Sequence, residues 1–184
     1  MFIGEDYFKT AMEMGIPFWS GVCINSKEGL IIMRAEVIGA MSSLLIHELT
    51  HLVIETYVGK NLLPLWLDEG IATYMTEKYG LGVVGRESYV KNAIMNNTYI
   101  KFNDLNGMAD ANIQSLSSDD SEIFYAESFS VVKFLKEKYK KESFSDFLSC
   151  LRQGNSLDTA LSKTFNLDSF DMLEVEWKKN YQGK

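Results

Sequence analysis

The chain has 184 residues, 46% of them hydrophobic, which is enough to bury a sizeable core in one domain. Its formal net charge of −7 repels phosphate backbones and anionic lipid, so nucleic acid is not expected as a partner. The longest uncharged apolar stretch near the centre, residues 37–46, is shorter than the about 20 residues that span a bilayer. Glu5 and Asp6 stand where a secretory signal would carry positive charge, so a cytoplasmic location is expected.

The predicted elements begin with a short helix at residues 5–15. Residues 17–34 then read as two strands joined by the turn-forming segment NSKEG, which predicts a hairpin. From about Glu36 the apolar residues recur at helical spacing until Gly59 offers a stop. This part of the chain therefore predicts a hairpin followed by a long helix.

The remaining chain is predicted to be helical. Pro64 can start the next helix and Gly80 can end it. A polar loop, NDLNGMADANIQSLSSDDSE, separates the predicted helix at residues 85–96 from the later helices. The further helices are predicted at residues 85–96, 122–140, 142–153, 156–164 and 168–180.

Both histidines of the chain, His47 and His51, lie in the segment HELTH inside the long helix. Residues four apart project from the same side of a helix, so the two imidazoles can bind one metal ion. Glu48 lies about 100° round the helix from His47 and can act as a base on a water at the metal. Two histidines placed at random would form this pattern on the order of once in a thousand chains, which favours a metal site.

A catalytic zinc site usually has three protein ligands and an open position, and neutral imidazole suits zinc. Glu69, in the next predicted helix, can be the third ligand if that helix returns opposite the histidines. A glutamate in a helix is more often solvated, so the residues alone leave both interpretations open. A metal-bound imidazole also needs an acceptor for its other N–H, and Asp68, Thr73 and Glu77 are candidates.

HELTH followed by PLWLDEGIATYM resembles the gluzincin zinc metallopeptidases, in which HExxH precedes a glutamate in a WLxEGxAxY-type segment. The later segments YAESFSVVKFLKEKY and FLSCLRQGNSLDTALSKTFNLDSFDMLEVEW are similar to the carboxy-terminal helices of the peptidase MA-like group in that clan. The resemblance covers roughly residues 29–180. It implies that His47, His51 and Glu69 bind one zinc ion per chain and that Glu48 activates a water.

The resemblance also implies a fold. We expect a zincin-like fold of the α+β class, mostly α-helical, with a small N-terminal β-sheet, an active-site helix, a glutamate helix and a C-terminal helical subdomain. Residues 1–184 would form one catalytic domain, with the zinc site in an N-terminal subdomain of about 1–80 and the helical subdomain at about 81–184.

The implied activity is hydrolysis of peptide bonds in peptides or unfolded proteins. Gluzincin aminopeptidases hold the substrate's amino group with the glutamate of an upstream GxMEN segment. GAMSS, at residues 39–43, lies inside the active-site helix and lacks that glutamate, which favours an endopeptidase. In gluzincins an edge strand above the zinc pairs with extended substrate, and Gly29–Arg34 is the strand closest in sequence to the helix.

The oxyanion of such a reaction needs a donor, and no histidine remains to supply it. Related peptidases place a tyrosine where Tyr125 stands in YAESFS, so the resemblance implies this role for Tyr125. A half-buried aromatic residue that packs the helix start is the alternative, and Tyr74 is another candidate donor.

Two other functions are compatible with a metal site in this chain. One is a zinc-binding but catalytically silent scaffold or regulatory module, and the other is a structural metal anchor. Glu48 argues against both, because neither needs a base beside the metal. The sequence leaves the oligomeric state open.

Overall fold

The computed structural model describes residues 22–25, 30–33, 41–79, 81, 85–109, 113 and 115–182. Strands β1 (Val22–Asn25) and β2 (Leu30–Met33) pair antiparallel, with Val22 opposite Met33 and Asn25 opposite Leu30. This confirms the predicted hairpin. The residues that connect the strands and the predicted helix at 5–15 lie outside the described part of the chain.

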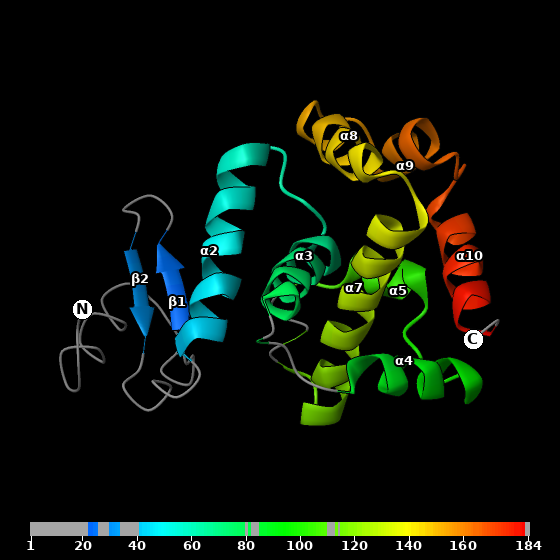
Figure 1. Ribbon diagram of the computed structural model, residues 1–184, viewed down its shortest axis with the longest axis horizontal. Helices are drawn as coiled ribbons and strands as arrows, with labels where there is room; N and C mark the ends of the chain where they lie inside the picture. Colours follow the sequence, from blue (N-terminus) through cyan, green and yellow to red (C-terminus); the bar gives the residue numbers. More distant parts are fainter. Residues whose placement is uncertain are drawn as a thin grey trace.

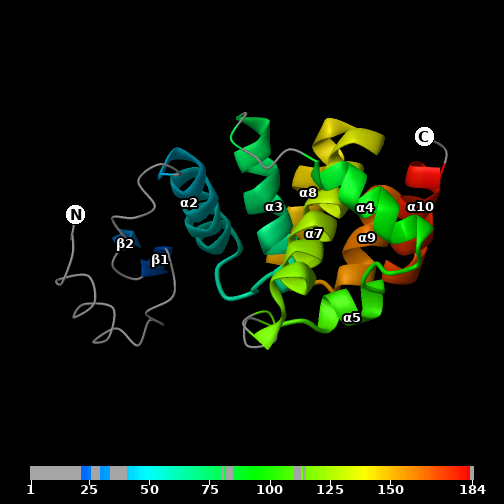
Figure 2. The same ribbon diagram turned by 90° about the horizontal axis from the view of Figure 1, so that it is seen from below.

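Helix α2 (Met41–Val58) is the predicted long helix, and its predicted first residues, 36–40, lie outside the described residues. It ends at Gly59, whose φ of 65° is the left-handed conformation that commonly terminates a helix. β1 contacts α2, and β2 lies on the other side of β1 (Figures 1 and 2). Helix α3 (Leu65–Lys78) begins directly after Pro64, as predicted, and packs beside α2.

Helix α7 (Ser118–Lys138) packs against α3 through the centre of the molecule (Figure 1). Gly70 makes this close packing possible, because a Cβ there would collide with the backbone carbonyl of Ser128 and lie 2.8 Å from Val132 Cγ2. Helix α7 starts earlier than predicted because the Ser117 hydroxyl caps it, accepting the backbone N–H of Asp120 at 3.1 Å. α7 therefore holds α3 in place from the side where Gly70 lies.

The other predicted helices are present within a few residues of their expected bounds. One short helix, α5 (Phe102–Gly107), was not predicted and lies, apart from Phe102, in the segment assigned as a polar loop. No described helix is both long enough and apolar enough to cross a membrane. The remaining helices are α4 (Arg86–Met95), α5 (Phe102–Gly107), α8 (Lys141–Arg152), α9 (Leu157–Phe165) and α10 (Phe170–Gln182).

The predicted α+β fold class is wrong for the described chain, whose architecture is helical. The described hydrophobic core runs from Ile54 to Tyr181 and consists of residues in the helices and their connections. The β-structure among the described residues is one hairpin with strands of four residues each, not a β-sheet layer that packs a core. An isolated pair of short strands is too small to form such a layer, so the hairpin did not justify an α+β class.

Candidate metal centre

The side chains of His47, His51 and Glu69 converge between α2 and α3. Glu69 Oε2 lies 3.1 Å from His47 Nε2 and 3.6 Å from His51 Nε2. One ligand atom from each residue lies within 4.8 Å of the other two. In the part of the chain that the structure describes, this is the one group of three His, Cys, Asp or Glu side chains that converges in this way.

The helices explain why these side chains meet. The histidines lie one helical turn apart on α2, and their ring centroids are 4.7 Å apart with an interplanar angle of 77°. The short connection after α2 brings the first turns of α3 beside them (Figure 2). Glu69 directly precedes Gly70, where α3 packs closely against α7, so the carboxylate is presented from a firmly packed part of the helix.

The chemistry and spacing of these donors fit a metal ion. Zinc bonds to imidazole nitrogen and carboxylate oxygen are about 2.0–2.2 Å long, so a tetrahedral arrangement separates the ligand atoms by about 3.3–3.6 Å. The measured separations of 3.1 Å and 3.6 Å lie close to this range. The side chains of His47, His51 and Glu69 are 22%, 19% and 15% exposed, so the centre is shielded but still accessible.

Asp68 supports one of the histidines. His51 Nδ1 donates a hydrogen bond to Asp68 Oδ2 at 2.9 Å, which leaves Nε2 directed toward Glu69. Of the three acceptor candidates in the sequence, the structure brings Asp68 to a histidine. Thr73 is buried, and Glu77 lies 3.9 Å from Arg86 Nη1. The sequence signal for Asp68 was its position next to Glu69, which did not distinguish it from the other two.

The charges of the cluster act on its titratable groups. Burial raises the pKa of Glu48, and the negative charges of Glu69 and Asp68 add to this rise, while His47 and His51 oppose it. Burial alone would lower the pKa of His51, but the hydrogen bond to Asp68 and the charges of Glu69, Asp68 and Glu48 raise that pKa to about 9. A metal that binds His51 must displace the extra proton of the charged imidazole, so metal affinity should fall as the pH is lowered.

The structure places Tyr125 in the second turn of α7, on the helix that packs against α3. It is half-buried against the hydrophobic core, and its ring meets the Phe124 ring edge-on at 5.4 Å between centroids. Tyr74, the other candidate donor, stacks on Phe129 at 6.4 Å. The role of either hydroxyl in an oxyanion site stays a prediction.

The strand predicted to bind substrate is described in its central part. β2 covers Leu30–Met33, whereas Gly29 and Arg34 lie outside the described residues. β2 pairs with β1 along one edge, and β1 is the strand between it and α2 (Figure 1). Pairing of β2 with a substrate therefore stays a prediction.

A family model described as the Peptidase MA superfamily matches residues 9–183. The match includes the cluster of His47, His51 and Glu69 and extends through the carboxy-terminal helices, which confirms the resemblance seen in the sequence motifs. Comparisons with the curated proteins and with the solved structures give no match.

Proposed function

We propose that this chain, which belongs to the Peptidase MA superfamily, is a zinc-dependent metallopeptidase that cleaves internal peptide bonds. The observation that carries the proposal is the convergence of His47, His51 and Glu69, with Glu48 at their side. Three protein donors leave a coordination position for a reacting molecule, and Glu48 supplies a base next to it.

His47, His51 and Glu69 would hold one zinc ion per chain. Two histidines and one carboxylate also suit iron(II), but zinc is proposed because hydrolysis needs no redox change and a base adjoins the ligands. When bound, the ion would lower the pKa of a water molecule and polarise the scissile carbonyl. Asp68 keeps the His51 ring in the orientation and tautomer that binding requires.

Glu48 is proposed to move the proton. Its carboxylate accepts a proton from the attacking water and passes it to the nitrogen of the leaving amine. The burial that raises its pKa brings that pKa closer to neutral pH, where an acid–base group works best. The Tyr125 hydroxyl is proposed to donate a hydrogen bond to the oxyanion, with Tyr74 as the alternative donor.

Peptides or unfolded proteins are the proposed substrates, because an extended chain can pair with the edge of β2. An endopeptidase is proposed because GAMSS supplies no glutamate to hold a free amino terminus. We also propose that residues 1–184 act as one catalytic unit, divided near residue 80, and that the protein works in the cytoplasm.

Metal analysis combined with a peptide-library digest tests this function. The purified protein should hold about one zinc per chain and cleave internal bonds. Glu48→Gln should keep the zinc and lose cleavage by about 10²–10⁴-fold. Blocking the amino termini of the peptides should leave cleavage unchanged. Zinc without cleavage by the native protein would favour the silent scaffold, and cleavage that requires a free amino terminus would show an aminopeptidase.

A further inference from the structure

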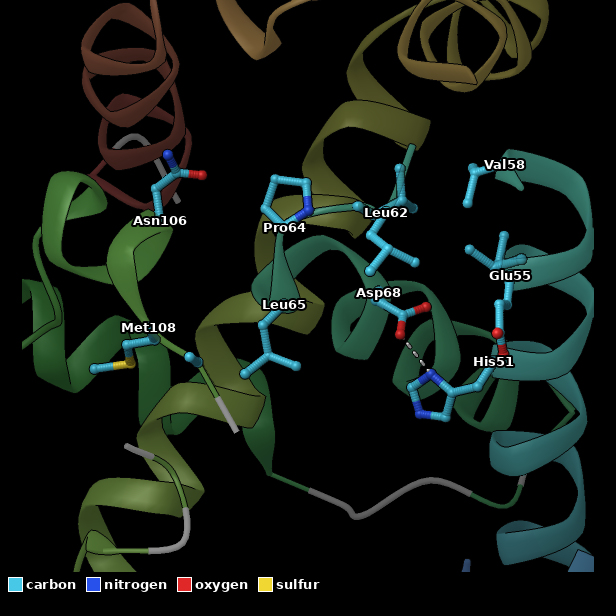
Figure 3. Close-up of a pocket in the computed structure, with 12 residues that line it drawn as sticks. His51, Glu55, Val58, Leu62, Pro64, Leu65, Asp68, Asn106 and Met108 are labelled. Carbon is cyan, nitrogen blue, oxygen red and sulfur yellow. Dashed lines mark hydrogen bonds and ion pairs between the residues drawn. The ribbon is translucent and has the colours of Figure 1, made fainter. Parts of the chain in front are cut away.

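A cavity of about 460 Å³ lies beside the metal centre (Figure 3). It is bounded by the second half of α2, the connection to α3, the start of α3, and the residues of α5 and just after it. Its volume falls in the range of about 300–1,000 Å³ that is typical of ligand pockets. The metal-centred mechanism gives this cavity no role.

The cavity shares two side chains with the metal centre. His51 and Asp68 line it, and their hydrogen bond therefore forms part of its wall. Neither His47 nor Glu69 is among the lining residues, so the cavity lies on the Nδ1 side of the His51 ring. A residue of an extended peptide spans about 3.3–3.6 Å, so a group bound here would lie within a few residues of a bond held at the metal centre.

The walls combine apolar and acidic groups. Ile54, Val58 and Leu65 contribute apolar surface, and Glu55 and Asp68 contribute carboxylates. In Figure 3 both carboxylates lie near the His51 ring, and Leu65 faces them across the cavity. Among the described residues, no lysine or arginine lines the cavity. The surroundings therefore suit a group with an apolar stem and a cationic head.

The wall contributed by α5 is held in place from the core. Asn106 lines the cavity, and its Oδ1 accepts a hydrogen bond from Trp66 Nε1 at 3.2 Å. Trp66 is fully buried and stacks on Phe170 with 5.2 Å between ring centroids. This anchoring means that the cavity is formed before a ligand arrives, which lowers the entropy cost of binding.

We propose that the cavity is a specificity subsite for a lysine or arginine side chain of the peptide substrate, close to the scissile bond. The assignment rests on the proposed peptidase function. The alkyl stem packs on Ile54, Val58 and Leu65, and the cationic head pairs with Glu55 and Asp68. The formal net charge of −7 also attracts cationic peptides to the protein.

Binding to zinc-loaded Glu48→Gln tests the subsite without turnover. The probes are library peptides without other charged side chains, in which one position at a time carries lysine, norleucine or glutamate. Calorimetry measures the affinity of each peptide. Norleucine keeps the alkyl stem and removes the charge. Glu55→Lys is added to reverse one charge in the cavity, and Glu142→Lys makes the same change in net charge at an exposed position on α8.

At one position near the scissile bond, lysine should bind about fivefold more tightly than norleucine, and glutamate least tightly. Glu55→Lys should remove this preference and Glu142→Lys should retain it. Equal affinity for the three peptides, or the same preference in Glu55→Lys as in the control, would overturn the subsite. A native protein that cleaves library peptides without basic preference would overturn the subsite alone. Lysine-selective binding without any cleavage by the native protein would instead overturn the peptidase function.

Discussion

The metal centre and the interior of α7 each place a glutamate among packed helices, in opposite surroundings. Glu69 is 15% exposed and has an imidazole nitrogen 3.1 Å from its Oε2. Glu127 is 0% exposed, and its Oε1 accepts the backbone N–H of Ile100 at 2.9 Å. The difference shows that a buried acid is a candidate for chemistry when other donors converge on an accessible space beside it.

Glu127 has a structural task instead. It holds the connection between α4 and α5, and Glu174 holds the same connection by accepting the Phe102 N–H at 3.0 Å and the Tyr99 hydroxyl at 2.7 Å. Burial raises the pKa of Glu127 to about 8, and the charge of Glu174 adds to this effect, while the Ile100 N–H and Lys101 oppose it. Near neutral pH this carboxyl therefore tends to keep its proton.

The largest expected effect comes from breaking the accessible cluster. Glu69→Ala removes one of three donors, so zinc affinity should fall on the order of 10²–10³-fold, because ligands share a binding free energy of about 10–16 kcal/mol. A competing chelator measures the affinity, and circular dichroism checks that the helices persist. Glu77→Ala is the matched control on the same helix and should keep native affinity. Equal affinities in Glu69→Ala and the native protein would remove Glu69 from the centre.

The next largest effect is expected at the buried glutamate. The pKa of Glu127 is the ordinary 4.5 in the unfolded chain and about 8 in the folded protein. Between these two pH values Glu127 is protonated in the folded state and ionised in the unfolded state. Glu127 therefore makes the free energy of unfolding fall as the pH rises through this range. The slope is about 1.4 kcal/mol per pH unit for one proton. Glu127→Gln should remove this slope, with similar stability near pH 5 and a gain of about 2 kcal/mol or more at pH 8.

Urea unfolding of both proteins with a chelator present, at several pH values, measures this difference. The contribution of the metal centre cancels between the two proteins because α7 carries the only change. Parallel stability curves would show that Glu127 is ionised in the folded state.

A smaller effect is expected when Asp68, the hydrogen-bond partner of His51, is changed and the histidine itself is kept. Asp68→Asn retains an oxygen near His51 Nδ1 but loses the negative charge, so zinc affinity or turnover should fall about 10–100-fold. The chelator competition used for Glu69→Ala measures this loss, and a smaller loss than in that variant is expected. Unchanged affinity and turnover in Asp68→Asn would show that His51 needs no charged partner.

The sequence predicted which three side chains converge better than it predicted the fold class. The convergence of His47, His51 and Glu69 could be expected because the histidine spacing and the motif that points to Glu69 are features of short segments. The helix α5 could not, because its six residues offer two buried apolar side chains, Phe102 and Leu105, and its stability comes from contacts distant in sequence. The Phe102 ring packs on Phe170 at 4.9 Å and on Trp177 at 5.1 Å between centroids. A periodic pattern does not contain such contacts.

The same limit applies to charged residues. Glu127 and Glu69 are both glutamates within helices, and helical spacing alone does not indicate that one is fully buried while the other faces histidines. Asp68 was one of three acceptor candidates until the structure showed its hydrogen bond. The helix bounds of α2 and α3 could be placed because Gly59 and Pro64 are local signals.

The smallest expected effect tests whether α7, the helix that carries the buried Glu127, also supplies the oxyanion donor through the Tyr125 hydroxyl. A hydroxyl directed at a developing oxyanion stabilises the transition state more than the ground state. Tyr125→Phe should therefore keep its zinc and lower kcat at least about tenfold, with KM nearly unchanged, because losing one oxyanion donor typically costs about 10²–10³ in rate and zinc shares the charge. Its Tm should stay within about 2–4 °C of the native value, the shift that corresponds to about 1 kcal/mol in a domain of this length.

Tyr74→Phe, on α3, is the matched variant, because it removes a hydroxyl from the alternative donor. A loss of turnover in Tyr74→Phe with native turnover in Tyr125→Phe would move the donor role to α3. Native turnover in both variants would exclude Tyr125 and Tyr74 as oxyanion donors, and Tyr125 would then be a packing residue like its neighbour Phe124, which is fully buried. A selective loss in Tyr125→Phe would instead mean that one helix supplies both the buried acid and a catalytic hydroxyl. Tyr125 at the metal centre and Glu127 in the hydrophobic core would then lie two residues apart on α7.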